Sequence, residues 1–301
     1  MIYTITFSPS LDYTMEVDNL KIGEINRSKK ERMVAGGKGI NVSVMLKHLG
    51  EDSVALGFVG GFIGDYIQKF LDEKMIETDF VRIEGNSRIN VKLSGDVETA
   101  INGVGGDISN EKINELLTKT LKLLENDYLV ISGNVPSNLP PYIYELLLSY
   151  IRTPNVKVVI DCQNLLLKNS LKYKPFLIKP NKKELEEYFN QEINTLEEVK
   201  QKCKLLQQEG AKNVIVSMGS EGAFMLTQNG EEIFVKAPKI TPKSSVGAGD
   251  ALIAGFIFEY QNSQDFEKAL KYGVAAGSAT TRSEYLATKE EVEELLNLMQ
   301  N

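Results

Sequence analysis

Short runs of apolar and β-branched residues recur along the chain and alternate with segments of helical periodicity. The runs are IYTITF (2–7), VALGF (54–58), YLVIS (128–132), VKVVID (156–161), FLIK (176–179) and NVIVS (213–217). Their length and composition favour buried strands. Helical periodicity covers residues 62–74, 110–125, 139–151 and 196–209. Near-continuous apolar strands separated by helices predict an α/β fold, in which helices cover both faces of a mainly parallel sheet.

A second pattern, strict alternation of apolar and polar residues, indicates strands that are buried on one face only. The alternating segments are YTMEVDNL (13–20), RINVKL (88–93) and VETAIN (97–102), and Ser94, Gly95 and Asp96 form a predicted turn. We predict that these strands form a small antiparallel lid, inserted at about residues 12–35 and 86–103 of a single domain spanning 1–301. Its apolar face must be covered by the active site or by a second copy of the chain.

Composition and charge exclude several classes of function. The 301 residues are 42% apolar and 25% charged, as in ordinary globular proteins. The formal net charge of −7 argues against a nucleic-acid or anionic-membrane surface. The run ALIAGFIF is too short to span a bilayer, and the first residues show no signal-peptide pattern. Two distant cysteines indicate reduced thiols, so we expect a cytoplasmic protein.

The first glycine cluster lies in AGGKGINVSVMLKHLG, residues 35–50. It surrounds Lys38 with Gly36, Gly37 and Gly39, and Asn41 follows one helical turn later. Glycine loses more conformational entropy than other residues when it is fixed, so the cluster requires a reason. The segment is either a simple loop before a helix or an anion site, formed by helix N-terminal amides and an ammonium group.

The second glycine cluster lies in SSVGAGDALIAGF, residues 244–256, where Gly247, Ala248 and Gly249 precede Asp250. Free amides at a helix start can stabilise negative charge on a phosphoryl group. Asp250 either accepts a proton from an attacking hydroxyl or only caps the helix. Two anion sites with a carboxylate suit a kinase that joins ATP to a phosphorylated acceptor. Walker, Rossmann and protein-kinase signatures are absent from the sequence.

Two further motifs follow predicted strands, at the edge of the sheet where a ligand would bind. In KPNKKELEEYF (179–189), Asn181 and Glu184 have the spacing of a capping box. From a strand end they could also reach, through water, the Mg²⁺ that accompanies ATP. SMGSEGA (217–223) predicts a tight turn between two strands. The turn either has no further role or wraps the phosphates or ribose of a nucleotide.

Taken together, these motifs resemble those of the ribokinase family, the carbohydrate kinases that include type B phosphofructokinases. The resemblance rests on AGGKGINVSVMLKHLG, SGNVP (132–136), KPNKKEL, SMGSEGA and SVGAGDALIAGF, in the order that the family shows, and it covers essentially the whole chain. It implies a ribokinase-like three-layer sandwich with a β lid. It also implies direct in-line transfer from ATP to an alcohol, with Mg²⁺ as cofactor.

The resemblance implies a role for individual residues. Gly247, Ala248 and Gly249 would stabilise the transferred group while Asp250 acts as general base. Asp12, Gly36, Gly37, Asn41, Asn90 and Ser132 would bind the sugar, and Lys38 with Arg88 would bind the phosphate that the sugar already carries. Lys179, Asn181, Ser217, Gly219, Gly222 and Gly277 would bind the nucleotide. Glu184 and Asn181 would hold Mg²⁺ through water.

Within the family, the substrate is suggested by FSPSLDYT, Lys38, SRINVKL and ETAING (98–103). These resemble the branch that phosphorylates ketohexose monophosphates, most closely the group that converts fructose 1-phosphate to fructose 1,6-bisphosphate. Tagatose-6-phosphate kinases form the sister group, and fructose 6-phosphate stays open as a substrate. Ser244 and Ser245 depart from the usual Asp-Thr, which leaves monovalent-cation dependence open. The segment AAGSATTRSEYLA lacks the glycine that family members usually carry after these small residues, which leaves nucleotide preference open.

A non-catalytic sugar-phosphate sensor with the same fold is an alternative from a different class. The intact Gly247–Asp250 segment argues against it, because a sensor needs neither the amide cradle nor the base. We expect a homodimer formed through the lid, and neither a nucleic acid nor a membrane as partner.

Overall fold

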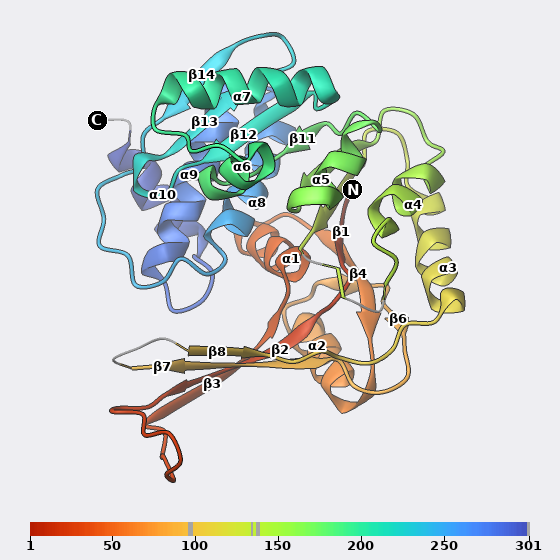
Figure 1. Ribbon diagram of the computed structural model, residues 1–301, viewed down its shortest axis with the longest axis vertical. Helices are drawn as coiled ribbons and strands as arrows, with labels where there is room; N and C mark the ends of the chain where they lie inside the picture. Colours follow the sequence, from red (N-terminus) through yellow and green to blue (C-terminus); the bar gives the residue numbers. More distant parts are fainter. Residues whose placement is uncertain (96–98, 134, 137–138, 300–301) are drawn as a thin grey trace.

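A computed structural model describes residues 1–95, 99–133, 135–136 and 139–299 (Figure 1). Its central sheet has the strand order β14-β13-β12-β11-β10-β9-β1-β4-β5, with β6 paired to the end of β4. The strands are β1 (Ile2–Thr6), β4 (Ser53–Val59), β5 (Glu77–Thr78), β6 (Val81–Arg82), β9 (Tyr128–Ser132), β10 (Lys157–Asp161), β11 (Leu177–Ile178), β12 (Asn213–Ser217), β13 (Ala223–Leu226) and β14 (Glu232–Val235). Among the described strands, only the pairs β12–β13 and β13–β14 are antiparallel, so the sheet is mainly parallel, as predicted.

Helices cover both faces of this sheet (Figure 1). One core contains residues of α1 (Lys38–Leu49), α2 (Gly61–Glu73), α8 (Ala248–Ser263), α9 (Phe266–Arg282) and α10 (Lys289–Leu298). The other contains residues of α3 (Asn110–Lys119), α4 (Ile143–Tyr150), α5 (Asn164–Leu171), α6 (Lys182–Phe189) and α7 (Leu196–Glu209). The three-layer prediction is therefore confirmed. The described part of the chain contains no helix with the length and hydropathy needed to cross a membrane.

The register of the parallel strands decides where functional residues can meet. Ile5 is aligned with Ile131, and Ser132 with Asp161, so β1, β9 and β10 end at the same edge. The loops that follow these strands, and the N-termini of the helices after them, gather at that edge. This is why motifs far apart in the sequence can build one site.

Three predicted elements of the main sheet and its helices are at least two residues shorter in the structure. Helix α4 begins at Ile143 instead of residue 139, because Pro140 disfavours helical geometry at the residue before it. Helix α3 ends at Lys119 and continues only as a 3₁₀ turn over Thr120–Lys122. Strand β11 covers only Leu177–Ile178 of the predicted 176–179. Pro180 follows closely and has no backbone N–H to donate to a neighbouring strand.

The lid is a separate sheet with strand order β3-β2-β7-β8 (Figure 1). Its strands are β2 (Ser10–Glu16), β3 (Lys30–Gly36), β7 (Arg88–Ser94) and β8 (Thr99–Asn102). The pairs β2–β3 and β7–β8 are antiparallel, and the two hairpins meet through the parallel pair β2–β7. The strand predicted at 13–20 was misplaced. The corresponding strand in the structure, β2, begins at Ser10 and ends at Glu16. Asp96 of the predicted turn, and residues 97–98, lie outside the described residues.

The lid has one polar and one apolar face. Asp12 is paired with Asn90, and these side chains face the body of the protein. The opposite face carries the apolar residues Tyr13, Met15, Met33, Ile89, Val91, Leu93 and Ile101. Met33 and Ile101 are 51% and 61% exposed, so the protomer leaves part of this face in contact with water.

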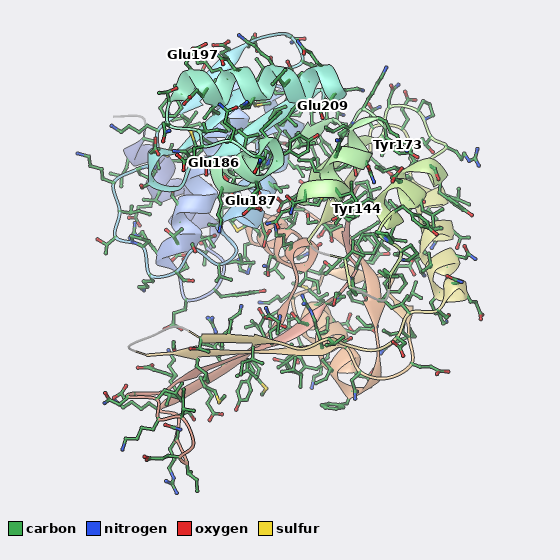
Figure 2. The ribbon with its side chains drawn as sticks, in the orientation of Figure 1. Tyr144, Tyr173, Glu186, Glu187, Glu197 and Glu209 are labelled. Carbon is green, nitrogen blue, oxygen red and sulfur yellow. The ribbon has the colours of Figure 1, made fainter. Side chains whose placement is uncertain are left out.

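Acidic side chains on the outer helices contribute to the net negative charge. Glu186 and Glu187 on α6, and Glu197 and Glu209 on α7, lie on the outer layer (Figure 2). Tyr144 on α4 instead points inward and is fully buried. Its hydroxyl donates to the carbonyl of Gly133 at 2.8 Å, which anchors the loop after β9.

Candidate active site

A cavity of about 1050 Å³ lies between the carboxyl edge of the main sheet and the polar face of the lid. Every residue to which the sequence analysis gave a role lines it, except Gly36. The cavity therefore joins the two glycine loops, the capping-box helix and the lid. The side chains of Lys38, Lys179 and Asp250 all line it.

The first glycine loop is shaped by close packing as well as by its helix. Helix α1 begins at Lys38, and Gly37 is its N-cap with a φ of 124°. A Cβ on Gly37 would lie 2.5 Å from the Thr6 methyl group, and a Cβ on Gly36 would lie 2.6 Å from the Asp12 carboxylate. Glycine at position 36 therefore leaves room for the Asp12 carboxylate.

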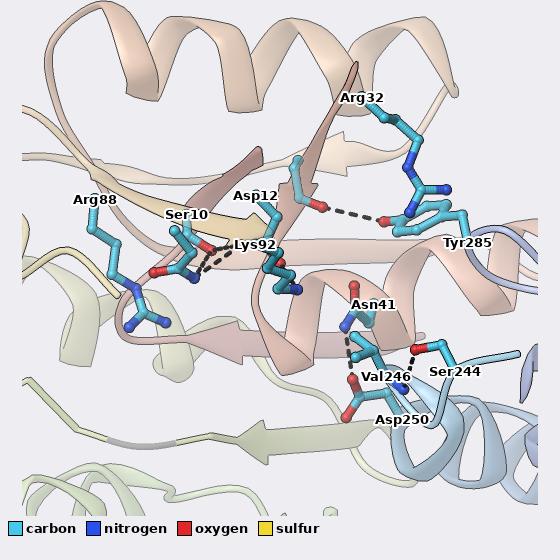
Figure 3. A network of polar contacts seen from close by, with 12 residues as sticks. Ser10, Asp12, Arg32, Asn41, Arg88, Lys92, Ser244, Val246, Asp250 and Tyr285 are labelled. Atoms are coloured by element: carbon cyan, nitrogen blue, oxygen red, sulfur yellow. Dashed lines mark hydrogen bonds and ion pairs between the residues drawn. The ribbon is translucent and has the colours of Figure 1, made fainter. Parts of the chain in front are cut away.

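The second glycine loop begins helix α8, with Gly247 as its N-cap. Asp250 does not cap this helix. Its carboxylate accepts a hydrogen bond from the Asn41 amide at 2.8 Å (Figure 3). The side chain is 5% exposed and lines the cavity. The alternative that Asp250 only caps the helix is therefore wrong.

Burial is the main cause that raises the pKa of Asp250 to about 7, and the nearby charge of Asp161 adds to it. The Asn41 hydrogen bond and the charges of Lys38 and Lys179 oppose this rise. A carboxylate with a pKa near neutrality is suited to accept a proton at physiological pH.

Asp161 is a central residue that sequence reasoning missed. It ends β10, is 2% exposed, and forms ion pairs with Lys38 at 3.0 Å and Lys179 at 3.3 Å. Burial would raise the pKa of Asp161, but the two lysines lower it below its usual value. Burial acts to lower the pKa of Lys38, and Asp161 with Asp250 reverses that effect, so the net direction is upward. Asp161 and Lys38 are therefore both held in their charged forms.

Lys179 lies directly beneath the second glycine loop. It is 4% exposed, and a Cβ added to Gly249 would come within 3.2 Å of its ammonium nitrogen. Glycine at this position lets the loop approach the lysine. Lys38 and Lys179 thus place two positive charges near the N-terminus of α8, where amides point into the cavity. Such an arrangement stabilises negative charge on a phosphoryl group.

The lid contributes a hydrogen-bond network centred on Asp12 (Figure 3). Its carboxylate accepts hydrogen bonds from Ser10 at 2.7 Å and Asn90 at 2.9 Å, and it forms an ion pair with Lys92 at 2.6 Å. Ser10 and Lys92 were missed in the sequence analysis. Lys92 could have been found from the alternation of RINVKL, which places it on the same face as Arg88 and Asn90.

Two buried polar atoms of uncharged side chains at the cavity wall have no hydrogen-bond partner among the residues that the structure describes. They are Oδ1 of Asn90, a residue that is 7% exposed, and Oγ of Ser132, a residue that is 1% exposed. Buried polar groups in native proteins are nearly always hydrogen-bonded, so such atoms favour a polar ligand. Arg88 lies nearby, where its Nε donates to the carbonyl of Ser8 at 3.1 Å and burial lowers its pKa.

The predicted capping box at α6 is confirmed. The side chain of Asn181 accepts from the amide of Glu184, and the side chain of Glu184 accepts from the amide of Asn181, both at 2.8 Å. The second carboxylate oxygen of Glu184 accepts from Gln163 at 2.6 Å. Within the described residues, no three His, Cys, Asp or Glu side chains gather closely enough to hold a metal by themselves. The side-chain oxygens of Asn181 and Glu184 fit a magnesium ion whose other ligands are water and phosphate oxygens.

The predicted turn between β12 and β13 is also confirmed, with a short 3₁₀ helix at Gly219–Glu221. Ser217 forms a β-bridge with Asn181, which places the turn beside α6. Gly277 on α9 permits close contact with α8, since its Cβ would lie 2.9 Å from the Ala248 carbonyl. Residues 236–240 also line the cavity, although the sequence analysis gave them no role.

Comparisons with known proteins agree with this geometry. The sequence profile of the pfkB family of carbohydrate kinases matches residues 6–292. The 1-phosphofructokinase of Bacillus subtilis strain 168 is 44% identical over 296 residues, covering 98% of this chain and 97% of the relative. The D-tagatose-1-phosphate kinase of Bacillus licheniformis is 36% identical over 302 residues, covering 100% and 99%. Among solved structures, phosphofructokinase-2 of Escherichia coli in complex with fructose-6-phosphate has a TM-score of 0.92 at 25% identity, covering 100% and 99%.

Proposed function

Because the chain belongs to the pfkB family of carbohydrate kinases, we propose that it transfers a phosphoryl group from ATP to fructose 1-phosphate, forming fructose 1,6-bisphosphate. The observation that carries this proposal is the buried Asp250 carboxylate beside the N-terminus of α8, with Lys38 and Lys179 close to it. Relatives named for substrates phosphorylated at C1, of fructose and of tagatose, support the choice of a ketohexose 1-phosphate.

Asp250 accepts the proton of the C6 hydroxyl as that oxygen attacks the γ-phosphorus of ATP. Asn41 orients the carboxylate through its hydrogen bond, so that one oxygen stays directed toward the acceptor. The amides after Gly247 and the ammonium group of Lys179 stabilise the charge on the transferred group. Bound magnesium would neutralise part of the nucleotide's charge, with Glu184 and Asn181 holding it through water.

The sugar binds between the lid and the first glycine loop. Asp12 and Asn90 offer acceptors for its hydroxyls, and the buried Ser132 hydroxyl lies on the same cavity wall. Arg88, whose guanidinium uses only Nε for the Ser8 carbonyl in the described contacts, binds the existing phosphate together with Lys38 in this proposal. The nucleotide occupies the wall formed by Lys179, Asn181, Ser217, Gly219, Gly222 and Gly277.

An ADP-release assay with a panel of acceptors tests the proposal. The purified protein is given ATP, magnesium and one of fructose 1-phosphate, tagatose 1-phosphate, tagatose 6-phosphate or fructose 6-phosphate. We expect the highest kcat/KM with fructose 1-phosphate. A higher value with tagatose 6-phosphate or fructose 6-phosphate would reassign the substrate, and sugar-phosphate binding without ADP release would indicate a sensor.

Lys38→Met is expected to raise KM for the sugar phosphate and to change KM for ATP little. The ammonium lies on the cavity wall, and a lost hydrogen bond to a charged group costs about 1.5–3 kcal/mol. Steady-state kinetics with each substrate varied in turn measures the effect. Lys168→Met, on the outer helix α5, is the control and should behave as the wild type. A rise confined to KM for ATP would instead assign Lys38 to the nucleotide.

We further propose that the protein is a homodimer joined through the lid. Helix α2 covers only part of the apolar face of the lid, and Met33 and Ile101 on this face are 51% and 61% exposed. An exposed apolar surface of this kind usually marks an interface, and a two-fold pair would cover both copies at once. The opposite face of the same sheet binds the sugar, so assembly and substrate binding share one element.

A further inference from the structure

The ion pair between Lys92 and Asp12 has no part in the mechanism described above. We propose that Lys92 is a positioning residue for substrate choice, which neutralises Asp12 so that the sugar site accepts a substrate carrying a phosphate. This inference rests on the proposed function, because it takes the acceptor to be a sugar phosphate.

The geometry of the lid separates Lys92 from the sugar. Asp12 lies opposite Asn90 in the parallel pair β2–β7, and Lys92 is two residues further along the same face of β7. Asp12 lines both the main cavity and a neighbouring cavity of about 650 Å³, whereas Lys92 lines only the neighbouring one. The ammonium therefore reaches the Asp12 carboxylate from behind, and it acts on a ligand through Asp12.

The ion pair is not needed to hold the lid strands together. Strands β2 and β7 are paired along their whole length, from Ser10 opposite Arg88 to Glu16 opposite Ser94. Asp12 also keeps two other donors, Ser10 at 2.7 Å and Asn90 at 2.9 Å. These two neutral donors fix the orientation of the carboxylate, and what Lys92 adds is a positive charge.

The other acidic groups of the cavity explain why a positive charge beside Asp12 matters. Asp161 is paired with two lysines, Glu184 is held in the capping box, and Asp250 is kept by burial at a pKa of about 7. Asp12 lies on the sugar side, where its charge would repel a phosphate dianion. A neutral sugar would feel no such repulsion. The effect of Lys92 should therefore increase with the charge of the substrate.

A double-mutant cycle in the full-length enzyme tests this inference. Lys92→Met is expected to raise KM for fructose 1-phosphate about tenfold, with kcat and KM for ATP nearly unchanged. In an Asp12→Asn background, the same substitution should change KM less than about twofold, because no charge is left to neutralise. Lys92→Arg should restore the wild-type KM. Lys30→Met removes another lid lysine, which pairs with Glu284, and serves as the control.

Each outcome decides between alternatives. If Lys92→Met raises KM equally with and without the Asp12 charge, Lys92 contacts the substrate or only supports the lid, and the inference is wrong. An unchanged KM in Lys92→Met also overturns it. Lys92→Gln repeats the test should the methionine variant lack a wild-type melting curve. A wild-type enzyme that phosphorylates none of the ketohexose phosphates would instead overturn the proposed function, and this inference with it.

Discussion

Asp250→Asn is expected to lower kcat by about 10²- to 10⁴-fold, the usual contribution of general-base catalysis. The amide cannot accept the proton of the attacking hydroxyl, but it has the size of the carboxylate and can still accept the hydrogen bond from Asn41. Binding of the sugar phosphate should therefore change little, and the loss should appear in kcat. Steady-state kinetics and a separate binding titration measure the two quantities.

The pH dependence of the wild type provides a second measurement of the same group. Burial and Asp161 raise the pKa of Asp250 to about 7. Below that pH the carboxyl is protonated and cannot act as a base, so kcat/KM should rise with pH through a midpoint near 7. In Asp250→Asn this rise should disappear from the residual activity.

A matched substitution elsewhere controls for unspecific effects. Asp265 caps helix α9 by accepting hydrogen bonds from the amides of Glu267 and Lys268. Asparagine is an equally good N-cap, so Asp265→Asn should keep both wild-type stability and activity. If Asp250→Asn kept nearly full kcat, or if its pH profile matched the wild type, Asp250 would have no role as the base.

The parts of the site that the sequence predicted are those set by local rules. Near-continuous apolar strands gave the parallel sheet, and parallel strands bring their carboxyl ends to one edge. The capping box of Asn181 and Glu184 needs only a spacing of three residues. Asp250 was found because it follows two glycines at the start of a helix, although the sequence alone left its capping role open.

The parts that were missed depend on contacts between distant segments. Asp161 pairs with Lys38, which is 123 residues away in sequence, and Asp12 pairs with Lys92 across 80 residues. No local pattern fixes such partners, because they arise only when β10 lies beside the start of α1 and β7 lies beside β2. The parallel pairing of β2 and β7 was missed for the same reason, since no turn connects these two strands.

The predicted length of α4 was wrong because the effect of proline on the residue before it was not taken into account. Hydrophobic periodicity extends back to Leu139, but this residue precedes Pro140 and Pro141. Proline restricts the residue before it to extended geometry, so the helix begins only at Ile143. The periodicity is real, because Leu139 and Ile143 are both buried in the same core.

The apolar face of the lid provides the second prediction with a large effect. Val91 lies opposite Tyr13 on β2 and opposite Ile101 on β8, so it is at the centre of this face. In a dimer joined through the lid, these residues would be removed from water in both copies. A charge placed there would be buried without a partner, which is strongly unfavourable.

Val91→Asp is expected to weaken the dimer by about 2 kcal/mol or more, roughly 30-fold in the dissociation constant. Ile101→Asp tests the same face at a residue that is 61% exposed in the protomer, so it should leave protomer folding intact. Light scattering should show monomers for both variants, and KM for the sugar phosphate should rise, because β7 also carries Arg88 and Asn90. Leu124→Asp, at a 70% exposed residue outside the lid, is the control and should stay dimeric. A fully active wild-type monomer at assay concentration would contradict the dimer, while the role of the lid in binding the sugar would stand.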